Sequence, residues 1–284
     1  MTDIARAQRF VDLHREGCFL LPNVWDAGSA RLFESVGFDA VATTSAGIAF
    51  SHGRPDHDFF TEHPDGGRLD RGAMLDKVRG IAGSVDIPVS ADLEEGYGEE
   101  PEAVARTIVD AMAAGAVGGN IEDFTGSRER PLFEHSLAVE RLRAARAAVD
   151  AAGAPFVLVG RTDSLLVGGT LQDSIARANA YLAAGADCAF VPGASDAETI
   201  STLARDLDGP LNVVMGLTGN ALSMAGLADL GVRRVTVGGS VARAMYSHLR
   251  AVAQELRVSG TFSYAQDQIS QSDLNQIFGP RARD

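Results

Sequence analysis

The sequence Pro88-Val-Ser-Ala-Asp92-Leu-Glu94-Glu95-Gly-Tyr-Gly98 passes from a short apolar segment into three carboxylates and then a glycine turn. Two later segments end in a similar way. Gly119-Asn-Ile-Glu122-Asp123 finishes in two acids, and Val157-Leu-Val-Gly-Arg161-Thr-Asp163 finishes in an arginine and an acid. Side chains two residues apart share one face of a strand, which places Asp92 beside Glu94. If the three strands are neighbours in a sheet, four acids and one arginine converge at its edge.

Eight apolar segments with the length of strands recur along the chain, and a helical pattern follows each of them except the second. The expected strands are 19–25, 39–45, 87–93, 117–122, 156–162, 188–192, 211–215 and 232–237. The clearest helices are alanine-rich and span 101–114, 137–152, 174–184 and 196–207. Three of them close on Ala-Gly-Ala, whose glycine can adopt the left-handed conformation that ends a helix.

This alternation predicts an α/β fold, because continuously apolar strands are typical of a parallel sheet that helices cover. Eight strand-helix units favour a closed (β/α)8 barrel, which we expect as one domain over residues 1–260. An open doubly wound sheet is the alternative, but no strand leads into the Gly-x-Gly-x-x-Gly turn of that fold. In a barrel the active site lies at the carboxyl ends of the strands, where the acidic segments fall.

The composition restricts the kinds of partner. A net charge of −13 and a pI near 4.9 argue against nucleic acid and anionic membranes, since both bind basic surfaces. No apolar stretch approaches the roughly 18 residues of a membrane helix, and the start shows no signal-sequence pattern, so we expect a cytoplasmic protein. Lys77 is the only lysine and lies in a helical pattern. Schiff-base catalysis and a P-loop both need a lysine at a strand end, so both are excluded.

The strand-end acids Asp92, Glu94 and Glu122 are either ordinary helix caps and surface carboxylates or metal ligands. We favour the metal site, because three acids on one face repel one another unless a cation neutralises them. Hard oxygen ligands select Mg²⁺, with Mn²⁺ as the alternative. Arg161 is either a structural partner of Asp163 or, as we expect, the group that stabilises an oxyanion of the substrate.

Three further segments carry expectations of their own. The connection 46–70 is long and polar, which is typical of a lid or binding loop. The loop 124–130 carries Arg128 and Arg130, which are either solvated charges or groups that gate the site. Residues 261–284 form a polar tail with scattered apolar side chains that a filled barrel does not accommodate. We therefore expect this tail to pack on a neighbouring subunit of a homo-oligomer.

Six short motifs, spread over nearly the whole chain, are similar to those of one group of barrel enzymes: Asn23–Ala30, Thr44–Ile48, Gly53–Asp56, Asp92–Gly98, Glu122–Asp123 and Arg161. On these motifs the chain resembles the isocitrate lyase/phosphoenolpyruvate mutase superfamily. The resemblance implies an Mg²⁺-dependent enzyme that acts on a small carboxylate through a metal-stabilised enolate. It also implies a dimer or tetramer in which the last barrel helix, here 240–257, is exchanged between subunits.

The resemblance implies a role for each matching residue. The residues that would hold the carboxylate of the substrate are Trp25, Ser45, Ala46 and Gly47. Asp92 would bind Mg²⁺ directly, and its water ligands would be held by Asp56, Glu94 and Glu122. The candidate catalytic residues are Arg161, Asp56 and Arg128.

The chain also departs from the superfamily pattern, and this leaves several reactions open. Glu94 and Glu95 replace an aspartate and a threonine, the loop 124–130 lacks the cysteine of the lyases, and Pro192-Gly193 matches neither lyases nor mutases. We favour carbon–carbon cleavage or decarboxylation of an oxaloacetate-like 2-oxo or 2-hydroxy acid. The alternatives are a phosphoenolpyruvate phosphonomutase or phosphonopyruvate hydrolase, and a non-catalytic binder of 2-oxo acids.

Overall fold

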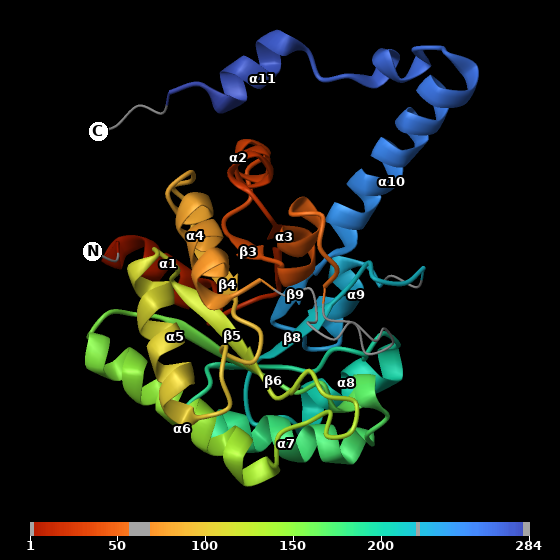
Figure 1. Cartoon of the computed structure of the whole chain (residues 1–284). Coiled ribbons are helices and arrows are strands. Elements are labelled where there is room, and N and C mark those ends of the chain that lie inside the picture. Colours follow the sequence, from red (N-terminus) through yellow and green to blue (C-terminus); the bar gives the residue numbers. More distant parts are fainter. Residues whose placement is uncertain (1–2, 57–68, 220–221, 281–284) are drawn as a thin grey trace.

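The computed structural model describes residues 3–56, 69–219 and 222–280. In that part of the chain nine short strands pair in parallel, and the sheet curls into a barrel with helices around it (Figure 1). The strands are β1 (Phe19–Leu21), β2 (Asn23–Val24), β3 (Val41–Thr43), β4 (Val89–Asp92), β5 (Gly118–Glu122), β6 (Val157–Arg161), β7 (Cys188–Phe190), β8 (Leu211–Val214) and β9 (Arg234–Thr236). They lie within the eight expected segments, so the (β/α)8 barrel is confirmed.

Two strands share the first of the eight positions. Pro22 separates β1 from β2, because proline has no N–H to donate to a sheet. β1 pairs with β9, whereas β2 pairs with β3, so the barrel closes between the first and the last strand. The order of the sheet is β1-β9-β8-β7-β6-β5-β4-β3-β2.

The helices are α1 (Ile4–Leu13), α2 (Ala27–Ser35), α3 (Ser45–Ser51), α4 (Arg71–Ala82), α5 (Pro101–Ala113), α6 (His135–Ala152), α7 (Leu171–Ala183), α8 (Ala197–Asp206), α9 (Met224–Asp229), α10 (Ser240–Gln254) and α11 (Gln271–Phe278). The four helices predicted in most detail are confirmed, and the glycines of the Ala-Gly-Ala segments, Gly115, Gly153 and Gly185, all have positive φ. In contrast, α3 was not expected, because the sequence predicted a loop from residue 46 onward. Among the described residues, no helix is long and apolar enough to span a membrane.

Helix α1 covers the amino-terminal end of the barrel. Its Phe10 is fully buried in a cluster with Leu21, Val117 and Val157, which belong to the strands and their approaches. A Cβ atom on Gly118 would lie 2.5 Å from the ring of Phe10, so glycine at the start of β5 lets the helix approach closely. Helix α1 therefore closes the amino-terminal end of the barrel, and the open end is the one at the carboxyl ends of the strands.

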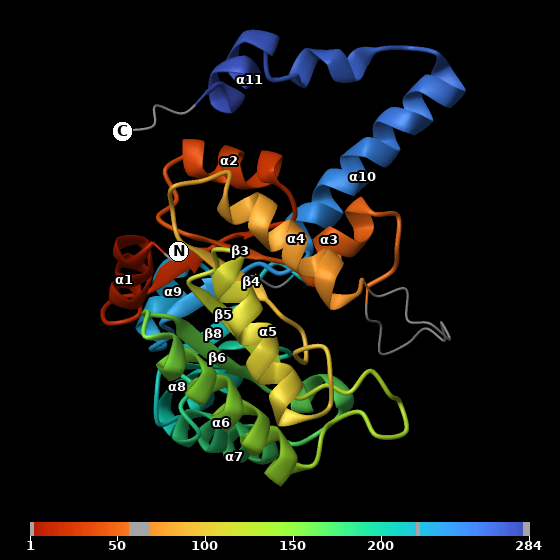
Figure 2. The same cartoon turned by 60° about the vertical axis from the view of Figure 1, so that its left-hand side comes forward.

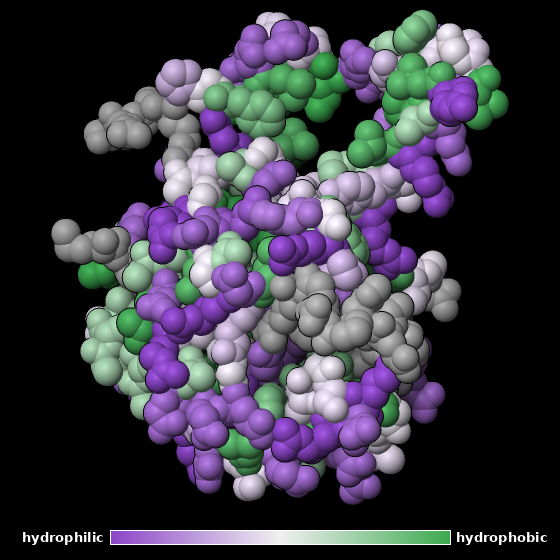
Figure 3. Space-filling view, in the orientation of Figure 1, coloured by the Kyte–Doolittle hydropathy of each residue, from purple (hydrophilic) through white to green (hydrophobic). Residues whose placement is uncertain are grey.

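A C-terminal arm, residues 240–280, leaves the barrel. In Figures 1 and 2, α10 runs outward from a start beside α3, and the chain then turns back so that α11 lies over α2. Arg31 of α2 donates hydrogen bonds to the carbonyl oxygens of Phe278 and Gly279, at 2.8 and 2.7 Å. The large apolar side chains exposed on the arm are Met245, Leu249, Leu256, Val258, Phe262, Ile269 and Phe278. Figure 3 shows hydrophobic surface along this arm.

Candidate active site

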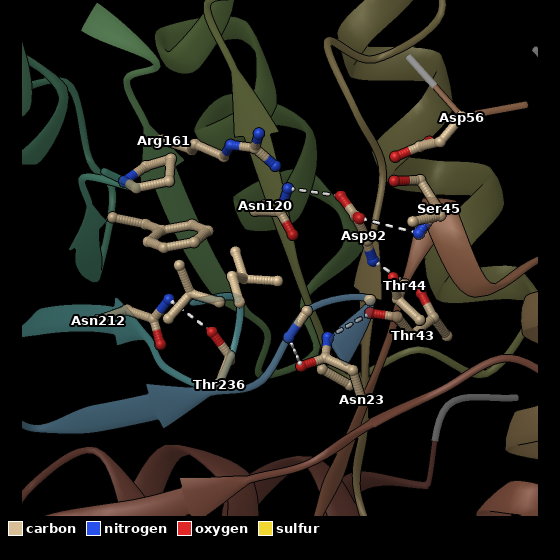
Figure 4. Close-up of a pocket in the computed structure, with 18 of the residues that line it drawn as sticks. Asn23, Thr43, Thr44, Ser45, Asp56, Asp92, Asn120, Arg161, Asn212 and Thr236 are labelled. Carbon is tan, nitrogen blue, oxygen red and sulfur yellow. Dashed lines mark hydrogen bonds between the residues drawn. The ribbon is translucent and has the colours of Figure 1, made fainter. Parts of the chain in front are cut away.

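A cavity of about 480 Å³ lies inside the barrel and opens toward the carboxyl ends of the strands (Figure 4). Its polar lining residues are Asn23, Thr43, Thr44, Ser45, Asp56, Asp92, Asn120, Arg161, Asn212, Arg234, Thr236 and Arg243. Its apolar lining includes Val159, Phe190 and Val214. The sequence predicted that the acids and the arginine converge if their three strands are neighbours. This is the case, because β4, β5 and β6 are consecutive in the sheet and Glu122 pairs in register with Arg161.

Asp92, the last residue of β4, is fixed from three sides. Its carboxylate accepts hydrogen bonds from the backbone N–H of Ser45 at 3.0 Å and from Nδ2 of Asn120 at 2.9 Å, and its own N–H donates to Oγ1 of Thr43 at 2.8 Å (Figure 4). Ser45 is the first residue of α3, whose N-cap is Thr44. The first N–H of this helix, which the sequence predicted as part of a cradle for the substrate, thus binds a carboxylate of the protein.

Arg161, the last residue of β6, is held by two carboxylates. Its Nε and Nη2 atoms donate to Asp163 at 2.6 and 2.9 Å, and Nη1 lies 2.8 Å from Oε2 of Glu122. Burial opposes its charge, but Asp163 and Glu122 outweigh that effect and keep the pKa of Arg161 well above the ordinary value. The structural ion pair is therefore present, and the same guanidinium also lines the cavity.

Glu122 shows the opposite balance. Burial raises the pKa of Glu122 well above the ordinary value, although the charge of Arg161 acts in the other direction. Burial likewise raises the pKa of Asp163 against the effect of the arginine. One guanidinium is shared by two buried acids, so the ionised form of both is stabilised only when a further cation lies nearby.

A smaller chamber of about 110 Å³ adjoins the main cavity. Four acids line it, Asp56, Glu94, Glu122 and Asp163, and it shares Ser45, Asp56 and Arg161 with the cavity. The backbone of Glu94 has a φ of 51°, and its Oε1 accepts a hydrogen bond from the hydroxyl of Tyr97 at 2.6 Å. Such a strained conformation at a non-glycine residue is typical of a functional site.

The predicted metal ligands fit a divalent cation by donor type. Their oxygen atoms are the ligands that Mg²⁺ prefers. Asp92 lines the main cavity, whereas Glu94 and Glu122 line the chamber. Within residues 3–56, 69–219 and 222–280, no three acidic, histidine or cysteine side chains are already drawn together around one point that an ion could occupy.

Two residues predicted to hold the substrate lie behind the cavity wall. Trp25 is buried in a cluster that includes Ile48, Met74 and Ala242. A Cβ atom on Gly47 would lie 2.7 Å from Cγ2 of Thr44 and 3.0 Å from Cβ of Trp25. Neither residue is part of the cavity lining, whereas Ser45 and Ala46 are. Trp25 thus packs beneath α3, and Gly47 within α3 allows this close packing.

The two loop arginines lie outside the cavity. Arg128 is exposed and lines neither the cavity nor the chamber, and Arg130 forms an ion pair with Glu99 at 3.1 Å. Asp56 lines both spaces. Most of the expected lid, 57–68, falls outside the described residues, and α3 occupies the first part of the segment 46–70.

Residues 10–257 match the phosphoenolpyruvate phosphomutase family. The chain belongs to this family. The match confirms the resemblance to the isocitrate lyase/phosphoenolpyruvate mutase superfamily that the sequence motifs indicated. Active sites of such barrels lie at the carboxyl ends of the strands, which is where this cavity opens.

Three similar proteins illustrate the range of the family. The structure of a proposed lyase/mutase from Burkholderia cenocepacia J2315 is 45% identical, with a TM-score of 0.92 over 98% of this chain and 97% of that one. An uncharacterized protein of Mycobacterium tuberculosis H37Rv is 36% identical, covering 81% of both chains. An oxaloacetate decarboxylase of Bradyrhizobium sp. BTAi1 is 32% identical, covering 84% of this chain and 81% of its own.

The family site has a polar side that the strand-end motifs did not indicate. Asn23 donates from Nδ2 to the carbonyl of Thr43 at 2.7 Å and accepts from the N–H groups of Val237 and Gly238, so it links β2, β3 and the end of β9. Asn212 and Arg234 lie deeper, within β8 and β9. A polar residue inside an otherwise apolar strand was the available signal for these side chains.

Proposed function

We propose that this protein is a divalent-metal-dependent enzyme that breaks a carbon–carbon bond in a small 2-oxo or 2-hydroxy carboxylate through an enolate. Decarboxylation of an oxaloacetate-like acid is the reaction we favour. The observation that carries the proposal is Arg161, a guanidinium that Asp163 and Glu122 orient on the wall of the cavity. The similarity of the whole chain to an oxaloacetate decarboxylase supports the same reaction.

The main requirement of decarboxylation is a positive charge near the 2-oxygen of the substrate. When the bond between C3 and the departing carboxylate breaks, CO2 leaves and the electron pair forms an enolate with negative charge on the 2-oxygen. A proton from solvent at C3 then gives pyruvate. A cation fixed near that oxygen lowers the barrier, because it meets the charge without first reorganising. Arg161 is the residue that we propose for this role, because its two carboxylate partners keep the guanidinium from turning away.

The amino end of α3 is the proposed anchor for the substrate. Ser45 and Ala46 line the cavity there. The N–H of Ser45 binds Asp92 and the N–H of Gly47 binds Thr44, so the N–H of Ala46 and the helix dipole would hold the carboxylate. A bound Mg²⁺ or Mn²⁺, held by Asp92 with Asp56, Glu94 and Glu122 nearby, would add Lewis-acid stabilisation of the negative charge. Asn120 and Thr43 would keep Asp92 oriented toward that ion.

The decisive experiment measures the release of pyruvate from oxaloacetate by the purified protein with Mg²⁺. We expect turnover above the rate that Mg²⁺ alone gives, loss of turnover with EDTA, and recovery with Mg²⁺ or Mn²⁺. The Asp92→Ala variant serves as the control and should not recover at any metal concentration. Full turnover in EDTA would refute the metal-dependent mechanism.

Chemistry at a phosphorus–carbon bond is the second candidate, because the matching family takes its name from a phosphomutase. Following phosphonopyruvate by ³¹P spectroscopy separates the candidates. A new phosphate ester or free phosphate indicates phosphonate chemistry, and an unchanged spectrum together with pyruvate release from oxaloacetate indicates carbon–carbon cleavage. Binding of 2-oxo acids without turnover of either substrate would indicate a non-catalytic binder.

A further inference from the structure

Arg234 is a buried arginine on the cavity lining that the proposed reaction does not use. It is the first residue of β9, and it is only 2% exposed. Its Nη2 atom donates to Oγ of Ser90 at 3.3 Å, while Nε and Nη1 have no hydrogen-bond partner in the described part of the chain. Two donors of one buried guanidinium are thus left for a group that enters the cavity.

The surroundings of Arg234 do not neutralise it. The ring of Phe10 lies 5.9 Å away, on the side where α1 covers the barrel. Burial lowers the pKa of Arg234 to about 10, and Cys188 and Asp92 only partly oppose the shift, so the guanidinium is still charged at neutral pH. A buried charge without a close partner is destabilising, which is a physical reason to expect an anion beside it.

Asn212 lies next to Arg234. The two residues pair in register on β8 and β9, and both line the cavity. Asn212 donates from Nδ2 to Oγ1 of Thr236 at 3.3 Å, whereas its Oδ1 has no hydrogen-bond partner among the described residues. Figure 4 shows Asn212 and Thr236 across the cavity from Ser45 and Asp56. Because Oδ1 only accepts hydrogen bonds, the group of Asn212 that can bind an anion at this depth is the second N–H of Nδ2.

The cavity has a cationic residue at each end. Arg161 is the last residue of its strand and Arg234 is the first of its own, two residues below Thr236. Two residues of strand correspond to about 6.6 Å, so Arg234 lies that much deeper than the end of β9. Cavities of about 300–1,000 Å³ bury drug-sized ligands, so a cavity of about 480 Å³ has room beyond a three-carbon acid.

We propose that Arg234 and Asn212 form a second anion-binding site at the floor of the cavity, which binds a distal carboxylate of the substrate. The substrate is then a 2-oxo or 2-hydroxy acid that carries a second anionic group on the side away from the helix α3 anchor. The apolar lining, including Val159 and Val214, contacts the carbon chain between the two charges. This inference rests on the proposed function for the site that holds the first carboxylate.

The test is calorimetric titration with linear dicarboxylates from oxalate to adipate, in buffer with Mg²⁺. We expect wild-type affinity to rise with chain length up to the diacid that spans the cavity. Arg234→Met should weaken that diacid by about 10- to 100-fold, the usual effect of losing a hydrogen bond to a charged group, and should change oxalate binding by less than about twofold.

The matched control is Arg233→Met, which alters the neighbouring arginine. Arg233 donates to the carbonyl oxygen of Gly17 and is not part of the cavity lining, so its loss should leave every diacid unaffected. Equal weakening by both variants, or equal weakening of oxalate and the long diacid by Arg234→Met, overturns the inference. If a phosphonate of matched length binds more tightly than the diacid, and Arg234→Met weakens it, the anion-binding site is supported and the preferred distal group is a phosphonate.

A structural role for Arg234 gives a different result. If the arginine is there to bind a ligand, Arg234→Met without ligand should melt no lower than the wild type, because methionine fills the space without a buried charge. If Arg234→Met does not fold, Arg234→Lys keeps the charge and should retain part of the affinity for the long diacid. Unchanged affinity in Arg234→Lys and Arg234→Met refutes the site. Because binding is measured, the test holds even if oxaloacetate is not turned over.

Discussion

Asp92, Glu122 and Arg161 lie at the ends of three neighbouring strands, where they line the cavity and the adjoining chamber. The sequence placed Asp92, Glu122 and Arg161 together because strand ends meet at one edge of a parallel sheet, and the register of β4, β5 and β6 confirms this. Arg234 was missed, because an arginine inside an apolar strand marks an unusual position but does not indicate whether its side chain points to solvent or into the barrel. Partners such as the N–H of Ser45 on Asp92 depend on a helix that the sequence did not indicate.

Arg161→Lys tests whether geometry or charge matters at the cavity wall. Lysine keeps the charge but cannot bind Asp163 and Glu122 as the planar guanidinium does, so we expect turnover to fall by about 10²- to 10³-fold. Arg128→Ala and Arg130→Ala should affect mainly KM, since both side chains lie on the outer loop. The measurement is kcat and KM on the substrate found by screening. Near-normal turnover in Arg161→Lys beside a loss in a loop variant would assign the chemistry to the loop.

His14 makes the fold sensitive to acid. Burial, with a smaller contribution from Arg234, lowers the pKa of His14 from 6.5 to about 3, and its ring packs edge-on against Phe10 and Phe19. Below pH 6.5 the unfolded chain binds a proton at this histidine that the folded chain does not bind. Stability is therefore full above pH 6.5 and falls as the pH drops toward 3, at about 1.4 kcal/mol per pH unit.

The check is thermal melting of wild type and His14→Gln from neutral pH to about pH 4.5. We expect the wild type to lose more melting temperature over this interval than the variant, even if the variant melts lower at neutral pH. His135→Gln is the control, because that histidine begins α6 at the surface. Parallel curves for wild type and His14→Gln would show that other groups cause the acid sensitivity.

At the level of elements, the periodicity of the chain predicted the strands and long helices, whereas tertiary packing determines the rest. Helix α3 has seven residues and contains Gly47, so its local preference for a helix is weak. It forms because Thr44 caps it, and because its apolar side packs on Trp25, Met74 and Ala242. These contacts join segments far apart in the sequence, which no local pattern reveals.

Arg141 of α6 controls the loop that carries the acids after β4. It is buried, stacks on Phe133 at 4.1 Å, and donates to the carbonyl oxygens of Glu95, Gly98 and Glu99. Arg141→Met leaves these carbonyls without their donor, so we expect a loss of about 2–4 kcal/mol of unfolding free energy. The matched variant Arg143→Met, on the exposed side of α6, should cost less than about 0.5 kcal/mol.

Urea denaturation of the two variants measures this difference. Activity at a temperature where Arg141→Met is folded should also fall, because the loop positions Glu94. If Arg141→Met is as stable as Arg143→Met, the loop is held by other contacts.

At the level of the whole molecule, the barrel accounts for residues up to about 239, and the arm that follows has no comparable core. Its apolar side chains are exposed on a single chain, and a soluble protein rarely leaves a large apolar patch uncovered. The sequence predicted a tail that packs on another subunit. A single chain does not show exchange of α10, so that exchange and the number of subunits stay predictions.

Removing residues 261–284 should lower the molecular mass measured by light scattering at micromolar concentration, with little change in the melting temperature of the barrel. The single substitution Phe262→Ser should weaken association in the same direction, because this side chain is 68% exposed on the arm. Val109→Ser, which alters an exposed residue of α5, should have no effect on mass. A wild-type protein with the mass of one chain would contradict the prediction.

The pairing of β1 with β9 has a consequence for synthesis on the ribosome. Translation adds roughly 5–20 residues per second, so the chain between Leu21 and Thr236 takes on the order of ten to forty seconds to appear. During that interval the first strand waits without its partner, and the growing sheet has an open edge at which other nascent chains could pair. Pro22, at this seam, removes one N–H donor from that edge, which weakens the pairing of another chain there.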